Sequence, residues 1–206
     1  MYVAIVDYGM SNLKSVFNAV NYVTSDNSKV KITSNYKDID EADKIVFPGQ
    51  GAINDCMTLL KQKNLVPSLR KAIDEKPFLG ICLGLQSLFE FSYEGEVECL
   101  SFLKGRVHSF KNLLFEAMPN SYKVPHMGWN TSKHNALGLF EGIANECYFY
   151  MVHSFYAQMC DETIASMEYG LAFSTALQKD NFYGVQFHPE KSSKAGAKLL
   201  ENFLKL

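Results

Sequence analysis

Apolar runs of strand length alternate with amphipathic helical patterns through residues 1–91 of this 206-residue chain. The strand-like runs lie at 2–7, 29–33, 44–47 and 78–82, and the helical patterns lie at 13–20, 52–61, 65–75 and 83–91. Strands and helices that alternate in this way form parallel sheets, because each helix carries the chain back across one face. We therefore expect an α/β fold in which a mostly parallel sheet has helices on both faces.

The pattern changes in the second half of the chain. From Gly105 to about Phe187 the sequence consists mainly of short extended runs: GRVHSF, YFYMVHSFYA, TIASMEYG, LAFSTALQ and NFYGVQFHPE. Such runs favour antiparallel hairpins attached to the parallel sheet. A closing helix follows, capped by Ser192 and Ser193. Because the sequence contains no repeat or linker, we expect one domain over residues 1–206.

Composition limits the partners of this chain. Its formal net charge of −2 argues against nucleic acid or an acidic membrane surface as the main partner. No apolar run approaches the ~20 residues that cross a bilayer, and the N-terminus lacks the basic region of a secretory signal. The five cysteines form no C-x-x-C pair. We therefore expect a cytoplasmic protein without disulfides, metal or cofactor.

One cysteine lies in an unusual setting, between the glycines of Gly80-Ile81-Cys82-Leu83-Gly84. A nucleophile at a sharp strand-to-helix turn needs small neighbours, as in the G-x-S-x-G turn of hydrolases. The following helix would favour the Cys82 thiolate, and the Leu83 N–H would face an oxyanion formed by attack. A buried cysteine in a glycine-rich turn fits this stretch equally well.

A nucleophilic cysteine requires a base, and the F-H-P-E stretch offers one. Alternate residues of an extended segment share a face, so His188 and Glu190 should point the same way. Pro189 between them favours extended geometry. Glu190 would then hold one imidazole nitrogen while the other faces the thiol. A strand end with surface side chains explains F-H-P-E alone, whereas both stretches in one chain favour a Cys-His-Glu triad.

These residues resemble the class I, or triad-type, glutamine amidotransferases. Further segments that match the family occur in the same order along the chain: 7–16, 47–51, 125–130, 148–156 and 184–193. The resemblance implies a flavodoxin-like α/β fold with an antiparallel extension. The stretches PHMGWN and QFHPEKS are similar to the glutaminase subunits of imidazole glycerol phosphate synthase. Those subunits pass ammonia from L-glutamine to a separate (β/α)8-barrel cyclase in histidine biosynthesis.

The resemblance also implies roles for individual residues. Cys82 would attack the side-chain amide of glutamine, His188 would transfer protons, and Glu190 would orient His188. The oxyanion donors would be the N–H of Leu83 and a peptide of the Gly49-Gln50-Gly51 loop.

Two further groups of residues follow from the resemblance. Glutamine binding is expected to involve Gln86, His153, Ser154 and Phe155. The cyclase is expected to lie near Asn12, Trp129 and Lys191. His126 and Trp129 are expected to be structural, or to face the partner and the ammonia path, rather than to take part in the chemistry.

Alternative functions remain open at this point. The same chemistry could supply a paralogous synthase, for example one that amidates a surface sugar. A glutamine-binding regulatory subunit without catalysis is a second class, and a cysteine hydrolase or redox sensor is a third. The sequence departs from the family at Gln50, where an aliphatic residue is common, and at Ser11, which replaces a usual glycine. These departures leave open which cyclase the chain serves.

Overall fold

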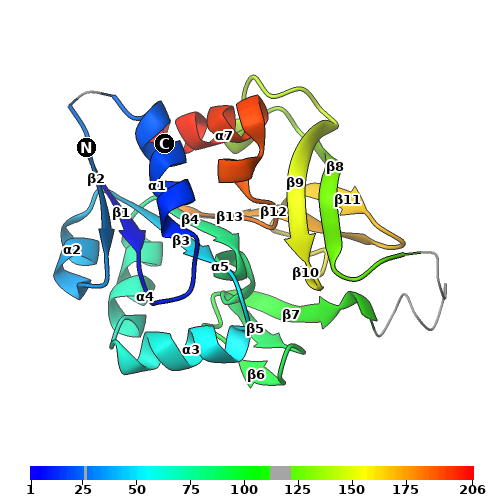
Figure 1. Cartoon of the computed structure of the whole chain (residues 1–206), viewed down its shortest axis with the longest axis horizontal. Coiled ribbons are helices and arrows are strands. Elements are labelled where there is room, and N and C mark those ends of the chain that lie inside the picture. The colour runs from blue at the N-terminus through cyan, green and yellow to red at the C-terminus, as the bar shows by residue number, and fades with distance from the viewer. Residues whose placement is uncertain (26, 112–121) are drawn as a thin grey trace.

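The computed structural model describes residues 1–25, 27–111 and 122–206 (Figure 1). Five parallel strands form its centre, in the spatial order β2-β1-β3-β4-β13. Their bounds are Tyr2–Val6 (β1), Lys29–Thr33 (β2), Lys44–Gly49 (β3), Phe78–Cys82 (β4) and Phe182–Val185 (β13). This is the strand order of flavodoxin-like folds. The predicted fold class is confirmed.

Helices cover both faces of this sheet (Figure 1). One face carries α1 (Leu13–Val23) and α7 (Ser193–Lys205), which share a buried cluster with strand residues such as Ile5 and Val46. The other face carries α2 (Tyr36–Glu41), α3 (Ile53–Gln62) and α4 (Val66–Glu75) over a second buried cluster. The strands β1, β3, β4 and β13 therefore have apolar side chains on both sides, which explains their nearly continuous apolar runs, whereas the edge strand β2 buries only one face.

The antiparallel extension begins at β13 and continues the same sheet. From β13 the order is β12-β10-β7-β5-β6, while β11 pairs with β12 and leads through β8 to β9. Their bounds are Phe89–Ser92 (β5), Val97–Glu98 (β6), Leu103–Ser109 (β7), His126–His134 (β8), Cys147–His153 (β9), Phe155–Ala157 (β10), Thr163–Glu168 (β11) and Ala172–Lys179 (β12). Short 3-10 helices lie at Gly138–Phe140 (η1) and Pro189–Lys191 (η2). The predicted antiparallel extension is confirmed except for β5, which pairs with β7 in parallel. The strands β5, β6 and β8 were not anticipated.

The helix expected over residues 83–91 is wrong in length. Helix α5 covers only Leu83–Gln86, and β5 begins three residues later. The backbone N–H groups of Leu100 and Phe102 donate to the carbonyls of Ser87 and Leu88, which diverts the chain from helical pairing. A single turn carries little macrodipole, so the expected support of the Cys82 thiolate by a long helix is lost.

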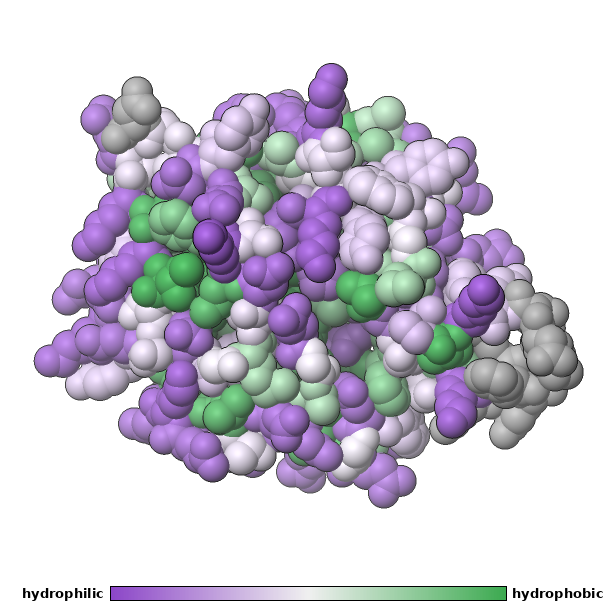
Figure 2. Space-filling model, in the orientation of Figure 1, coloured by the Kyte–Doolittle hydropathy of each residue, from purple (hydrophilic) through white to green (hydrophobic). Residues whose placement is uncertain are grey.

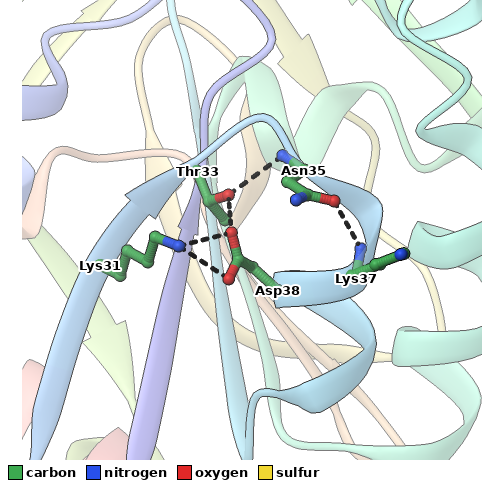
Figure 3. Close-up of polar contacts among 5 residues, drawn as sticks. All are labelled: Lys31, Thr33, Asn35, Lys37 and Asp38. Atoms are coloured by element: carbon green, nitrogen blue, oxygen red, sulfur yellow. Dashed lines mark hydrogen bonds and ion pairs between the residues drawn. The ribbon is translucent and has the colours of Figure 1, made fainter.

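Helix α2 was also not anticipated, and a small polar network holds it to β2 (Figure 3). The Asn35 side chain accepts from the Lys37 N–H at 3.0 Å and caps the helix. Asp38 accepts from Lys31 Nζ at 2.8 Å and from the Thr33 hydroxyl at 2.6 Å. These hydrogen bonds from Lys31 and Thr33 hold the pKa of Asp38 below its usual value.

The N-termini of α1 and α7 are held in different ways. Asn12 precedes α1 and its side chain accepts from the Ser15 N–H at 3.4 Å. Ser192 occupies the cap position of α7, yet its hydroxyl makes no capping bond. It instead donates to the His188 carbonyl at 2.6 Å and accepts from the Tyr150 N–H at 3.0 Å. The Ser192 side chain therefore anchors the segment that carries His188.

Hydrophobic and polar side chains are interspersed on the surface. On the face shown in Figure 2, hydrophobic side chains form separate groups among polar ones. None of the helices within the three described ranges combines the length and hydrophobicity that a bilayer-spanning helix requires.

Candidate active site

Three segments distant in sequence meet at one edge of the parallel sheet. Cys82 ends β4, Gly49 ends β3 opposite it, and His188 follows the end of β13. The carboxyl ends of neighbouring parallel strands lie at the same sheet edge, which is where α/β folds bind their ligands. The topology therefore brings the cysteine and histidine stretches together.

Cys82 adopts a backbone conformation that few residues other than glycine adopt, with φ 55° and ψ −109°. Its glycine neighbours make this sharp turn possible. A Cβ atom on Gly84 would lie 1.9 Å from the Phe47 carbonyl oxygen, and one on Gly80 would lie 2.9 Å from the Gly84 carbonyl oxygen. The turn packs directly against β3, and its strained cysteine faces the sheet edge.

His188 and Glu190 form a buried pair, with 2.8 Å between Nδ1 and Oε1. The Glu190 side chain is only 3% exposed. The conformation that was expected to produce this pair is wrong, because Pro189–Lys191 form a 3-10 helix rather than an extended run. Pro189 takes the first helical position, where its missing N–H costs nothing. Glu190 reaches His188 by curling back within one turn.

The protonation of His188 reflects opposing effects. Burial disfavours the imidazolium, but the charge and hydrogen bond of the Cys82 sulfur oppose it, and Glu190 adds in the same direction. The net result raises the pKa of His188 to about 10. These contacts favour a protonated imidazolium at His188, held between the Cys82 sulfur and the Glu190 carboxylate.

A cavity of about 420 Å³ opens beside this pair. Ten of the residues singled out in the sequence line it: Gln50, Gly51, Cys82, Leu83, Gln86, His153, Ser154, Phe155, His188 and Lys191. Glu190 lies behind His188. Gly49 is next to the lining residue Gln50 but does not itself line the cavity. A Cβ atom on Gly49 would lie 2.5 Å from the Tyr8 hydroxyl.

The predicted oxyanion donors differ in availability. Leu83 is the first residue of α5, so its N–H has no partner within the helix. The Gln50 N–H is engaged, since it donates to the Met10 carbonyl at 3.4 Å. In this conformation the Gln50 N–H cannot donate into the cavity, which leaves Gly51, a lining residue with φ 96°, as the other candidate of the loop.

A chain of hydrogen bonds fixes His153 in the cavity wall. His153 Nδ1 donates to the Phe155 carbonyl at 2.8 Å, so Nε2 accepts from His126 Nδ1 at 3.0 Å. Asn130 Nδ2 then donates to His126 Nε2 at 3.4 Å. Burial lowers the pKa of His126 to about 4 and that of His153 to about 3. Both imidazoles are neutral at pH 7, which fits the structural role expected for His126.

Two of the residues expected near a partner lie around Tyr150, and the third lies on a separate loop. Trp129 is 51% exposed and makes an edge-to-face contact with the Tyr150 ring at 6.0 Å. Lys191 Nζ lies 5.6 Å from the same ring and also lines the cavity. Asn12 is exposed at the start of α1.

Two polar residues near the site were not anticipated. Glu94 lines the cavity, its Oε2 accepts from the Ile53 N–H at 3.3 Å, and burial raises its pKa. Its position depends on the short α5, which the sequence pattern did not reveal. Gln186 lies 3.7 Å from the Cys82 sulfur. Its spacing of two from His188 in the predicted extended run NFYGVQFHPE is the signal that could have identified it.

Known proteins with similar sequences show the family of this chain. The family model for class-I glutamine amidotransferases matches residues 4–206. The subunit HisH of imidazole glycerol phosphate synthase from Nitrosococcus oceani is 47% identical, covering 98% of this chain and 96% of the relative. The HisH subunit from Nitrosospira multiformis is 44% identical over 98% and 97% of the two chains.

A solved structure shares the fold at low sequence identity. A glutamine amidotransferase from Thermotoga maritima is 16% identical with a TM-score of 0.59, covering 100% of this chain and 83% of its own. The chain therefore belongs to the class-I glutamine amidotransferase family, together with the HisH subunits of imidazole glycerol phosphate synthase.

Proposed function

We propose that this chain hydrolyses L-glutamine to glutamate and ammonia as the glutaminase subunit of an imidazole glycerol phosphate synthase. The observation that carries the proposal is the strained Cys82 beside the buried His188–Glu190 pair, in the wall of one cavity. A nucleophile, a base and a group that orients the base are the parts that a covalent acyl transfer requires.

The reaction follows from these parts. The Cys82 thiolate attacks the side-chain amide carbon of glutamine, and the resulting oxyanion accepts from the Leu83 N–H. The imidazolium of His188 gives its proton to the departing nitrogen, so ammonia leaves and a thioester remains. Neutral His188 then takes a proton from water, the hydroxide attacks the thioester, and glutamate leaves as the thiolate reforms. Glu190 holds the same ring orientation in both steps.

The cavity offers groups for the amino-acid end of the substrate. The Glu94 carboxylate lies in the cavity wall and suits the α-ammonium group of glutamine, and Lys191 suits its α-carboxylate. His153, Ser154 and Phe155 close the same wall, with Phe155 held by hydrogen bonds to its carbonyl. We assign glutamine binding to these residues together with Gln86.

The ammonia must be used by a second protein. The relatives are named as subunits of imidazole glycerol phosphate synthase, and a barrel needs about 200 residues of its own. We infer a heterodimer with a (β/α)8-barrel cyclase in the cytoplasm, serving histidine biosynthesis. A paralogous synthase would use the same site, so the pathway needs its own test.

Glutamate formation with and without the cyclase tests the chemistry. The chain with its cyclase and the cyclase ligand should release glutamate, and Cys82→Ala should abolish this release. The matched control is Cys147→Ala, which removes a half-exposed thiol outside the cavity and should leave the rate unchanged. Equal rates of glutamate release for Cys82→Ala and the unmodified chain would contradict the proposal that Cys82 is the nucleophile.

Complementation tests the pathway. The gene should restore growth without histidine to a strain that lacks its own glutaminase subunit, when it is expressed with its cognate cyclase. A soluble, active protein that fails to restore growth would favour a paralogous synthase.

A further inference from the structure

Gln186 is a fully buried polar side chain that the reaction described above does not use. It lies on the segment that follows β13, two residues before His188, and its exposed fraction is 0%. Its Nε2 atom lies 3.7 Å from the Cys82 sulfur, within hydrogen-bonding distance for sulfur. The amide thus contacts the atom that would attack the substrate.

The neighbouring residues fix which end of this amide faces the sulfur. Gln86 Nε2 donates one hydrogen to the Phe155 carbonyl at 2.8 Å and the other to Gln186 Oε1 at 2.9 Å. An oxygen is required opposite Gln86, so the Gln186 NH₂ group points at Cys82. The Phe155 carbonyl is held in turn by His153 Nδ1 at 2.8 Å. The hydrogen bonds among His153, Phe155 and Gln86 therefore fix the orientation of the Gln186 amide.

We propose that Gln186 is a catalytic residue that donates a hydrogen bond to the Cys82 sulfur, and that Gln86 is the positioning residue that aims it. This assignment rests on the proposed function, in which Cys82 is the nucleophile. The donor favours the thiolate over the thiol and restricts the direction in which the sulfur can point.

The need for this donor follows from the fold. Helix α5 is a single turn, so its dipole gives the sulfur little support. His188 balances the thiolate only while it is protonated, and during each turnover its proton passes to the departing ammonia and is replaced from water. Gln186 transfers no proton in the reaction, so its hydrogen bond to the sulfur is available in both protonation states of His188. The ionisable groups around Cys82 are His188, Glu190, His153, Tyr8, Glu94 and Lys191.

The pH dependence of Cys82 alkylation tests the proposal on the full chain, without substrate or partner. Iodoacetamide is the probe, and peptide mass spectrometry separates Cys82 from the half-exposed Cys147 and Cys160. Gln186→Met keeps the volume and removes the donor, and should move the midpoint of reactivity upward by about 1 pH unit. Gln86→Met keeps Gln186 but removes the hydrogen bond that orients its amide, and should move the midpoint of reactivity upward by a smaller amount.

Gln178→Met is the matched control. This glutamine on β12 donates to the Tyr183 hydroxyl at 3.2 Å, so its loss removes a comparable bond away from the sulfur. Its alkylation midpoint should equal that of the unmodified chain. Gln186→Asn keeps an amide, but its side chain is one methylene too short to reach Cys82. If Gln186→Met fails to fold, the alkylation midpoint of Gln186→Asn is measured instead, and it should also move upward.

A folded Gln186 variant with the unmodified midpoint would overturn the proposal, whereas a purely structural role would change stability and leave the midpoint in place. With the cyclase present, the Gln186 variants should lower kcat about tenfold with a smaller change in KM. If the unmodified chain releases glutamate through Cys82 and the midpoints do not move, the inference fails and the proposed function stands. If Cys82→Ala keeps full activity, the proposed function itself fails.

Discussion

At the scale of single residues, the role that we propose for Glu190 is exerted only through His188. It lies behind the imidazole, accepts from Nδ1 at 2.8 Å and leaves the other ring nitrogen facing the sulfur. Its charge also helps to raise the pKa of His188. In the proposed mechanism both effects concern the chemical steps, since His188 lines the cavity and Glu190 does not.

Glu190→Gln should therefore lower kcat by about 10²- to 10⁴-fold and leave KM nearly unchanged, since an amide oxygen still accepts from His188 but carries no charge. Steady-state glutamate release with the cyclase measures both constants. Glu201→Gln on α7 is the control, because it removes a carboxylate that pairs only with exposed lysines at that surface. A KM effect as large as the kcat effect would place Glu190 in substrate binding.

The neutral His153 makes folding stability depend on pH. Burial lowers its pKa to about 3, whereas the unfolded chain binds a proton near pH 6.5. Its contribution to stability is complete above pH 6.5 and declines as the pH falls toward 3, by roughly 1.4 kcal/mol per pH unit. The raised pKa of His188 acts at higher pH, between about 6.5 and 10, where its contribution is lost.

Urea unfolding at pH 7.5 and 5.5 measures this effect. The unmodified chain should lose more stability between these values than His153→Gln, which cannot titrate. Because His188 is present in both proteins, its contribution cancels in the comparison. Equal losses in the two proteins would mean that His153 is protonated in the folded chain.

At the scale of elements, the turn between β4 and α5 depends on Gly84. Gly84→Ala should destabilise the chain by roughly 2 kcal/mol or more and abolish glutamate release, because the new Cβ would lie 1.9 Å from the Phe47 carbonyl oxygen. Gly138→Ala is the matched change, since Gly138 has φ 55° but open space around it. It should cost about 1 kcal/mol of backbone strain and keep activity. Thermal unfolding and glutaminase assays measure both variants.

Elements with strong local patterns could be predicted from the sequence, and elements defined by distant contacts could not. The strands β1 and β4 are continuous apolar runs because both faces are buried, and their bounds, like those of the edge strand β2, were predicted to within a residue. The prediction of one helix over residues 83–91 failed because the apolar residues of this stretch fit a helix as well as they fit a short helix followed by a strand. Only the bonds from Leu100 and Phe102 to Ser87 and Leu88 end it, and those lie more than ten residues away.

The candidate site divides in the same way. The cysteine turn and the histidine-glutamate pair were visible because each is a short stretch with its own geometry. Glu94 and Gln186 were missed because their roles arise when separate segments meet at the sheet edge. The His188–Glu190 pair formed through a 3-10 turn instead of an extended run, so the expected contact occurred by a different local conformation.

At the scale of the whole molecule, we propose that the parallel and antiparallel parts unfold as one domain. They share a sheet, and β13 pairs with β4 on one side and β12 on the other. The single tryptophan, Trp129, reports on the extension, whereas far-ultraviolet circular dichroism reports mainly on the helices of the parallel part. Both signals should give the same urea midpoint. Two separated midpoints would indicate two domains.

The assembly with a cyclase should depend on the exposed residues beside the cavity. Trp129 exposes about half of its surface, and Tyr150 and Lys191 connect it to the cavity wall. An exposed aromatic side chain of this kind is typical of the residues that dominate binding energy at interfaces. Trp129→Ser should therefore weaken cyclase binding by about tenfold or more.

Sedimentation of the two purified chains measures this affinity, and glutamate release at saturating cyclase separates binding from catalysis. Tyr22→Ser is the control, because Tyr22 is 83% exposed near the end of α1, at the opposite sheet edge from Cys82. It should leave the affinity unchanged. If Tyr22→Ser weakens binding and Trp129→Ser does not, the cyclase docks at the opposite end of the sheet, and ammonia would have no direct path from Cys82 to its partner.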